Sequence, residues 1–223
     1  LPKGIECIGH NAFNGCLSLQ SVDIPKSVKE IGDWAFEECR SLRSVVIPEG
    51  VKKISWFTFK GCINLRSVRI PSSVVSIGRE AFKGCKALES VIVPKGVEEI
   101  QQGAFQGCST LRSLTLTEGL EYISDSAFEG CSSLESLVVP ESVSGIGGNA
   151  FAYCSSLEAI LFLGKGKASS TLWLSDDPFH SCGARHFFER CVYARFACIS
   201  WLRQSRIHIG FCGGGSSGGL RPF

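Results

Sequence analysis

Residues 19–41 read Leu-Gln-Ser-Val-Asp-Ile-Pro-Lys-Ser-Val-Lys-Glu-Ile-Gly-Asp-Trp-Ala-Phe-Glu-Glu-Cys-Arg-Ser, and the same pattern returns every 23 residues. The most regular markers are a phenylalanine, a cysteine three residues later and a leucine three residues after that. The cysteines of this series are Cys16, Cys39, Cys62, Cys85, Cys108, Cys131 and Cys154. A fixed period of roughly 20 to 50 residues is typical of repeat proteins, in which each unit packs against its neighbours. We therefore predict one continuous solenoid.

Each repeat contains two segments that we predict to be extended. In the first, Leu19, Val22 and Ile24 form the L-x-x-L-x-L signature of a leucine-rich repeat, and the alternation of apolar and polar residues predicts a strand. Pro25 ends this strand because proline has no backbone N–H to donate. The apolar pair in residues 28–32, followed by glycine, predicts a shorter extended segment that closes in a turn.

The segment Ala35-Phe36-x-x-Cys39 closes the repeat. Its spacing places Phe36 and Cys39 on one face of a predicted short helical turn, and the small Ala35 lets this turn lie close to the sheet. Phenylalanines of successive coils are expected to stack into a core spine. The cysteines have two interpretations. A row of buried free thiols is favoured, because parallel positions suit stacking better than disulfide geometry and an odd number cannot pair completely. Disulfide bonds or a bound metal are the alternative.

The string from Ile70 to Leu88, Ile-Pro-Ser-Ser-Val-Val-Ser-Ile-Gly-Arg-Glu-Ala-Phe-Lys-Gly-Cys-Lys-Ala-Leu, closely resembles the BspA-like leucine-rich repeats. The resemblance covers about residues 1–163 and implies an α/β repeat solenoid. The expected fold is a right-handed leucine-rich repeat with a parallel β-sheet, short second extended segments and short helical turns. The resemblance also implies a cell-surface or secreted protein, mostly from bacteria and some protozoa, that binds host matrix proteins or other cells. It carries over no catalytic motif.

The register of the pattern divides the chain into parts. Residues 1–163 hold seven in-register repeats, of which the first is partial. Phe179 and Cys182 restore the Phe-x-x-Cys unit 28 residues after the preceding one. Residues 164–182 are therefore predicted to be a divergent eighth repeat with a five-residue insertion in a loop, where solenoids tolerate insertions.

The last part of the chain loses the repeat. For residues 183–212 we expect a C-terminal cap, with an arginine-rich amphipathic helix near 184–204, and a poorly structured tail is the alternative. Residues 213–223 are rich in Gly and Ser and are predicted to be a flexible tail. The chain opens within a repeat and contains no Met, so we expect it to be part of a longer protein.

Charge and composition narrow the possible functions. Residues 1–164 hold 15 Lys and Arg against 18 Asp and Glu, whereas residues 165–223 hold 8 against 3. The repeats therefore form no polyanion-binding surface by bulk charge, and we expect no nucleic-acid partner. The longest apolar runs are too short for a membrane span. No nucleophile elbow, P-loop or dinucleotide motif occurs, so we expect no enzymatic activity.

A zinc site near the C-terminus is disfavoured because the spacing of its candidate ligands matches no C-x-x-C pattern. The candidates are His180, Cys182, Cys191, Cys198 and Cys212. We therefore expect no metal and no cofactor.

The first candidate binding surface is aromatic. Trp34, Trp56 and Phe57 stand just before the Ala-Phe position of two adjacent repeats, at sites that are polar or glycine elsewhere. Aromatic side chains are the commonest anchors of protein interfaces, so these three are candidate ligand-binding residues. The alternatives are contact with another part of the parent protein and packing under a neighbouring turn.

The second candidate surface is the outward face of the predicted sheet. Its candidate residues are Val46, Arg69, Ile92, Val138 and Leu161. The apolar members suggest a shallow groove for a protein partner, although β-propensity alone also explains them. A third row, in which Arg43, Arg66 and Arg112 join Arg69, favours a solvated face of mixed charge over a basic strip.

These observations together predict a non-enzymatic protein-binding module of a cell-surface or secreted protein. We expect adhesion to host matrix or to other cells, an extracellular protein ligand and a monomeric chain. A structural spacer that presents another domain of a longer protein is the alternative. A module that accompanies a catalytic domain elsewhere in the parent protein is a third possibility.

Overall fold

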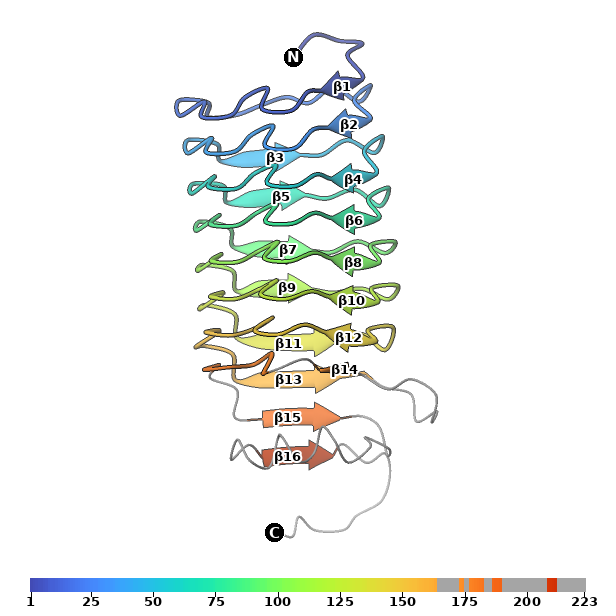
Figure 1. The fold of residues 1–223 in the computed structure, drawn as a ribbon, viewed down its shortest axis with the longest axis vertical. Coiled ribbons are helices and arrows are strands. Elements are labelled where there is room, and N and C mark those ends of the chain that lie inside the picture. The colour runs from blue at the N-terminus through green and yellow to red at the C-terminus, as the bar shows by residue number, and fades with distance from the viewer. Residues whose placement is uncertain (164–172, 175–176, 183–185, 190–207, 212–223) are drawn as a thin grey trace.

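The computed structural model describes residues 1–163, 173–174, 177–182, 186–189 and 208–211. The chain winds into a pile of coils, and its strands form two columns of arrows in Figure 1. Neighbouring strands within each column are parallel, and their partners in residues 1–163 are 23 residues apart. The predicted parallel-stranded solenoid is therefore confirmed.

The first column, which we call the long-strand wall, carries the L-x-x-L-x-L segments. It consists of two four-stranded sheets, ordered β3-β5-β7-β9 and β11-β13-β15-β16. The bounds are β3 (Ser44–Val46), β5 (Ser67–Arg69), β7 (Ser90–Ile92), β9 (Ser113–Thr115), β11 (Ser136–Val139), β13 (Ala159–Phe162), β15 (His186–Glu189) and β16 (His208–Phe211). The equivalent stretch of the first repeat, around Val22, is not strand.

The second column, the short-strand wall, consists of the shorter extended segments that the sequence predicts. Its sheets are β1-β2 and β14-β12-β10-β8-β6-β4. The bounds are β1 (Cys7–Ile8), β2 (Glu30–Ile31), β4 (Lys53–Ile54), β6 (Ser76–Ile77), β8 (Glu99–Ile100), β10 (Tyr122–Ile123), β12 (Gly145–Ile146) and β14 (Trp173–Leu174).

The turn between the two walls follows from the proline that ends each long strand. The carbonyl of Pro71 accepts a hydrogen bond from the amide of Val74 at 3.2 Å, and equivalent bonds form at Pro25, Pro48, Pro94 and Pro140. Proline stands at the first position of this turn, where its carbonyl accepts the bond and its missing N–H ends the strand. Thr117, the exception in the series, accepts the same bond from Leu120.

The core lies between the two walls and the Ala-Phe turn. A central coil buries Val74, Ile77, Ala81, Phe82, Cys85 and Leu88 completely. The predicted phenylalanine spine is confirmed, with eight rings stacked at centroid distances of 5.0–5.6 Å and interplanar angles of 2–12°. Its members are Phe13, Phe36, Phe59, Phe82, Phe105, Phe128, Phe151 and Phe179.

The short helical turns of the expected α/β fold are not observed, because the described residues contain no helix and the Ala35–Cys39 segments are turns. The amides of Trp34, Phe36 and Glu38 donate to carbonyls of the next coil, at 3.0, 2.8 and 2.7 Å. A helix would direct these amides back into its own segment. The amides of alternate residues can point to the next coil because Trp34 and Glu38, on both sides of Phe36, have a left-handed backbone, with φ of 56° and 57°. The contacts between coils therefore replace the helical bonds.

The pile continues beyond the in-register repeats. Phe179 stacks on Phe151, and β14 pairs with β12, so described parts of residues 164–182 form a further coil. The helix expected near 184–204 is wrong at 186–189, which form strand β15 beside β13. The open edge of β13 offers backbone partners that a strand satisfies and a helix does not. Residues 164–172, 190–207 and 212–223 lie outside the described residues.

Candidate functional site

The residue two positions before each spine phenylalanine is left-handed in every described coil. The φ angles run from 41° to 62° at Asn11, Trp34, Phe57, Glu80, Gly103, Ser126, Asn149 and Asp177. Glycine and asparagine tolerate this conformation, whereas it is unfavourable for a bulky side chain. Trp34 and Phe57 therefore occupy positions at which the backbone favours other residues.

Trp34 and Phe57 contact each other outside the core. Their rings are stacked, with centroids 5.4 Å apart and an interplanar angle of 2°. The Lys60 ammonium lies 5.0 Å from the centre of the Phe57 ring, which is a cation–π geometry. Lys60 also pairs with Glu80 at 3.3 Å and with Glu37 at 3.8 Å. The two rings thus form a flat aromatic strip, and the ion pairs of Lys60 with Glu37 and Glu80 lie beside it.

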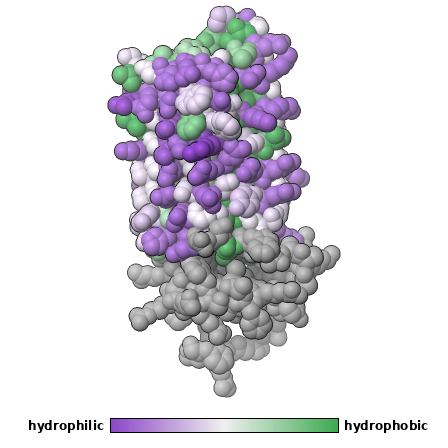
Figure 2. Space-filling model, viewed as in Figure 1, coloured by the Kyte–Doolittle hydropathy of each residue, from purple (hydrophilic) through white to green (hydrophobic). Residues whose placement is uncertain are grey.

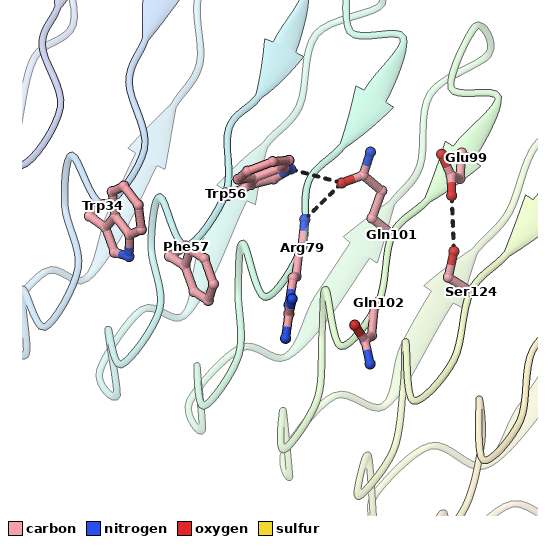
Figure 3. Close-up of a pocket in the computed structure, with 8 residues that line it drawn as sticks. All are labelled: Trp34, Trp56, Phe57, Arg79, Glu99, Gln101, Gln102 and Ser124. Carbon is pink, nitrogen blue, oxygen red and sulfur yellow. Dashed lines mark hydrogen bonds between the residues drawn. The ribbon is translucent and has the colours of Figure 1, made fainter.

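Trp56 lies beside this strip and is 52% exposed. Its ring runs over Gly78 of the next coil, where an added Cβ would lie 3.0 Å from Trp56 Cδ1. The indole Nε1–H donates to Oε1 of Gln101 at 3.1 Å, across the intervening coil. The same oxygen accepts the backbone N–H of Arg79 at 3.1 Å. One glutamine therefore fixes both the indole and the loop beneath it (Figure 3).

Gln101 compensates for a hydrogen-bond acceptor that tryptophan lacks. In other coils the equivalent backbone N–H is satisfied by the coil before it: Asp33 Oδ1 accepts from Trp56 N at 2.9 Å, and Asp125 Oδ1 accepts from Gly148 N at 2.7 Å. The indole of Trp56 offers a donor and no acceptor, so the next N–H, that of Arg79, needs another partner. Gln101 supplies it from the following coil.

These side chains line an open groove of about 460 Å³, which we call the aromatic groove. It crosses several coils along the axis of the pile (Figure 3). The lining residues are Trp34, Trp56, Phe57, Arg79, Glu99, Gln101, Gln102 and Ser124. Glu99 accepts a hydrogen bond from the Ser124 hydroxyl at 3.0 Å, which holds its carboxylate at the end farthest from Trp34. The groove thus combines aromatic faces with a few polar groups, the usual composition of a ligand site.

Sequence reasoning singled out the three aromatic residues and missed their polar partners. Gln101 stands where other repeats have glycine or serine, at Gly32, Ser55, Gly78, Ser124 and Gly147. This departure from the repeat was the available signal. Its partner Trp56 is 45 residues away, however, and the period of 23 residues does not relate the two positions.

The candidates on the long-strand wall do not form a continuous apolar surface. Val46, Ile92 and Val138 are 57%, 65% and 44% exposed, and Leu161 is half-buried. Polar residues interrupt the row, because Val46 is in register with Arg69 and Ile92 with Thr115. Val138 is in register with Leu161 and Leu161 with Phe188, so the apolar neighbours of this row lie at one end of the wall. Figure 2 shows one face of the molecule, on which hydrophilic residues predominate and hydrophobic residues are scattered.

The cysteine series is a ladder of hydrogen-bonded thiols. From Cys39 to Cys154, each Sγ–H of the series donates to the carbonyl of the spine phenylalanine of the preceding coil, at 3.1 Å for Cys39 and 3.4 Å for Cys131. The cysteines of the described residues are free thiols. Burial raises the pKa of Cys39 from 9.0 to about 11 and that of Cys154 to about 12. The thiolate, the reactive form of cysteine, is therefore disfavoured along the ladder.

The described candidate zinc ligands near the C-terminus lie outside the groove. His180 Nδ1 lies 3.1 Å from Asp177 Oδ2, while Cys191, Cys198 and Cys212 lie outside the described residues. In the described part of the chain, no group of three potential metal ligands comes together. The same part contains no helix that is long and apolar enough to cross a membrane.

Comparison with known protein families matches the BspA-type leucine-rich repeat region in six copies, over residues 1–101, 35–158 and 76–182. The chain belongs to this family. The BspA-type repeat and its fold are typically non-enzymatic, and they indicate a protein-interaction module. A comparison with curated proteins finds no match.

Solved structures of bacterial leucine-rich repeat proteins resemble this BspA-type chain. The leucine-rich repeat protein of T. pallidum is 34% identical over 69% of this chain and 72% of its own, with a TM-score of 0.63. A leucine-rich cell surface protein of Faecalibacterium prausnitzii is 36% identical over 73% of this chain and 44% of its own, with a TM-score of 0.67. A Bacteroides ovatus protein is 28% identical, over 93% and 64%, with a TM-score of 0.52.

Proposed function

We propose that this chain is the protein-binding part of a cell-surface or secreted protein, and that it adheres to extracellular matrix or to other cells through the aromatic groove. One observation carries the proposal: Trp34 and Phe57 hold a left-handed backbone and lie outside the buried core. Such strain costs roughly 1–3 kcal/mol at a residue and is concentrated at functional sites. Core packing does not account for keeping two aromatic residues there.

The surroundings of the strained pair support binding. Trp56, the third aromatic residue, is half-exposed and is oriented by Gln101. Its side chain therefore loses less conformational entropy when a partner binds. Aromatic residues held in this way are typical interface anchors. The cell-surface location rests on the F. prausnitzii relative, which is described as a cell surface protein.

The test compares two folded variants for capture by immobilised matrix and cell-surface proteins. The groove variant carries Trp34→Asn, Trp56→Asp and Phe57→Asn, residues that the fold already holds at equivalent positions of other coils, as in Asn149 and Asp125. The control variant carries Val46→Ser, Ile92→Ser and Val138→Ser on the long-strand wall. We expect the groove variant to lose at least tenfold in affinity, and the control to bind as the unmodified chain does.

Two outcomes would contradict this assignment. Loss of binding in the control variant with retention in the groove variant would move the site to the long-strand wall. Failure of the unmodified chain to bind any protein of the panel would favour the alternative, a spacer that presents another part of a longer protein.

A further inference from the structure

The backbone amides at the aromatic end of the groove are already hydrogen-bonded. The amides of Trp34, Phe57 and Glu80 donate to carbonyls of the following coil at 3.0, 2.9 and 3.0 Å. The amide of Arg79 donates to the Gln101 side chain. A ligand therefore cannot add as a β-strand at this end of the groove, because strand addition needs unpaired backbone groups. Recognition must come from side chains.

The side-chain groups that remain for a ligand are mainly donors. Gln101 uses its Oε1 for two internal bonds, and its amide nitrogen makes no hydrogen bond to a described residue. The Gln102 side chain is exposed and likewise unbonded among the described residues. The Arg79 guanidinium approaches Glu80 no closer than 4.0 Å. The middle of the groove thus presents N–H groups beside the aromatic rings (Figure 3).

The charges of the groove exclude one class of aromatic-site ligand. Three aromatic rings can form a cage for a quaternary ammonium group. Here Arg79 projects into the same groove, and the Lys60 ammonium already lies against Phe57. Arg79 would repel a second cation at the aromatic end, whereas Glu99, the carboxylate of the lining, lies at the far end of the groove. The ligand that fits is rich in acceptors, apolar and without positive charge.

The direction of the groove sets the shape of that ligand. The groove follows the axis of the pile from Trp34 to Ser124. Parallel strands of neighbouring coils are about 4.8 Å apart, so two coils span about 9.6 Å. A polyproline II helix repeats every three residues, or about 9.3 Å. Successive turns of such a helix would therefore lie beside every second coil.

We propose that the aromatic groove binds a proline-rich segment in the polyproline II conformation. Proline offers a carbonyl acceptor and no N–H, which matches the free donors of Arg79, Gln101 and Gln102. Its rings pack against the faces of Trp56 and of the Trp34–Phe57 strip, and the helix is stiff before binding, so little entropy is lost. The inference rests on the proposed function and specifies the partner of the same groove.

The test titrates the whole chain with a nine-residue polyproline peptide and, separately, with a nine-residue Gly-Ser peptide, followed by calorimetry. We expect saturable binding of polyproline with a Kd below about 1 mM, and none of the Gly-Ser peptide. Trp56→Asp should weaken binding at least tenfold. Gln102→Ala, which removes one exposed donor, should weaken it about three- to tenfold. Val138→Ser, on the long-strand wall, should leave it unchanged, and melting curves confirm that each variant is folded.

The inference is overturned if polyproline shows no saturable binding, if the Gly-Ser peptide binds equally well, or if neither groove variant weakens binding. A cello-oligosaccharide is titrated in parallel, because stacked aromatic rings also suit sugars. Binding of the sugar without binding of polyproline overturns the inference as well. If polyproline fails while a matrix protein is still captured and lost in the groove variant, the proposed function stands and only this partner class is wrong.

Discussion

At the scale of the residue, the recurring left-handed positions decide which side chains the turns accept. Glycine fills the position before the cysteine at Gly61, Gly84, Gly107 and Gly130, with φ between 72° and 74°. Glu38 occupies the same position with a φ of 57°. Its carboxylate pairs with Arg40 on an exposed surface, where an ion pair contributes little.

We expect Glu38→Gly to raise the free energy of unfolding by about 0.5–1 kcal/mol, because relief of the left-handed strain outweighs the extra flexibility of the unfolded chain. Urea denaturation measures the change. The neighbouring Glu37→Gly is the control, since Glu37 has no left-handed backbone, and it should lower stability instead. A loss of stability in Glu38→Gly would show that this position carries no strain.

The hydrogen bonds of Gln101 give a second prediction. Gln101→Leu removes the acceptor of both Arg79 N–H and Trp56 Nε1, and should cost about 1–3 kcal/mol. The double variant Trp56→Asp/Gln101→Ser places at position 56 the aspartate that accepts the next coil's amide at Asp33, and at position 101 the serine found at Ser55. It should therefore be more stable than Gln101→Leu. Equal stability of the two, measured by thermal unfolding, would mean that this network is dispensable.

At the scale of the element, neighbouring coils rather than local turns decide where glycine is required. A Cβ on Gly78 would lie 2.7 Å from the Ile54 carbonyl oxygen and 3.0 Å from Trp56 Cδ1. Gly9 occupies the same repeat position in the first coil, where a Cβ would meet nothing within 4 Å. The two glycines therefore form a matched pair that differs in the coil packed against them.

We expect Gly78→Ala to lower the free energy of unfolding by about 1–3 kcal/mol, as overpacking does, and to shift the fluorescence of Trp56. Gly9→Ala should change stability by less than about 0.5 kcal/mol. Chemical denaturation and the emission spectrum of the folded state provide the two readouts. Similar effects of both substitutions would show that the local turn, and not the neighbouring coil, sets the requirement.

At the scale of the whole molecule, stability comes from a spine that every coil shares. Phe82→Ala, in the middle of the pile, should cost about 3–5 kcal/mol because the cavity is closed in by coils on both sides. Phe13→Ala should cost less, since Phe13 is only partly buried. Denaturant titrations of the two variants test this order. A loss below about 1 kcal/mol for Phe82→Ala would exclude a stabilising spine.

The thiol ladder makes stability sensitive to alkaline pH. Below pH 9 the thiols are protonated in both the folded and the unfolded chain, so their contribution is constant. Above pH 9 the unfolded chain forms thiolates, whereas burial holds the pKa of Cys39 at about 11 and that of Cys154 at about 12. The unfolded state therefore binds fewer protons, and stability falls as the pH rises from 9.

The expected loss is about 1 kcal/mol per fully buried thiol by pH 10, measured by urea denaturation under reducing conditions. Cys85→Ala/Cys108→Ala removes two fully buried thiols and should flatten the decline between pH 8.5 and pH 10. An unchanged slope would assign the alkaline loss to Lys or Tyr groups instead.

The sequence by itself determined the solenoid, its parallel strands, its buried cysteines and its phenylalanine spine. These features depend on the same residue recurring in contact with its own copy one coil away, so a period of 23 residues is sufficient to predict them. The family followed from the same string of residues. The repeat also predicted that Trp34 and Phe57, which are 23 residues apart, occupy the same position in adjacent coils.

Only the tertiary structure decided how the turns are built and what surrounds the aromatic residues. The Ala-Phe-x-x-Cys spacing fits a helical turn equally well, and the amides turn toward the next coil because that coil supplies their acceptors. Trp56 meets Gln101 across an intervening coil, over a glycine that leaves room for the ring. Such contacts depend on side-chain direction and on single departures from the repeat, and therefore the period alone does not determine them.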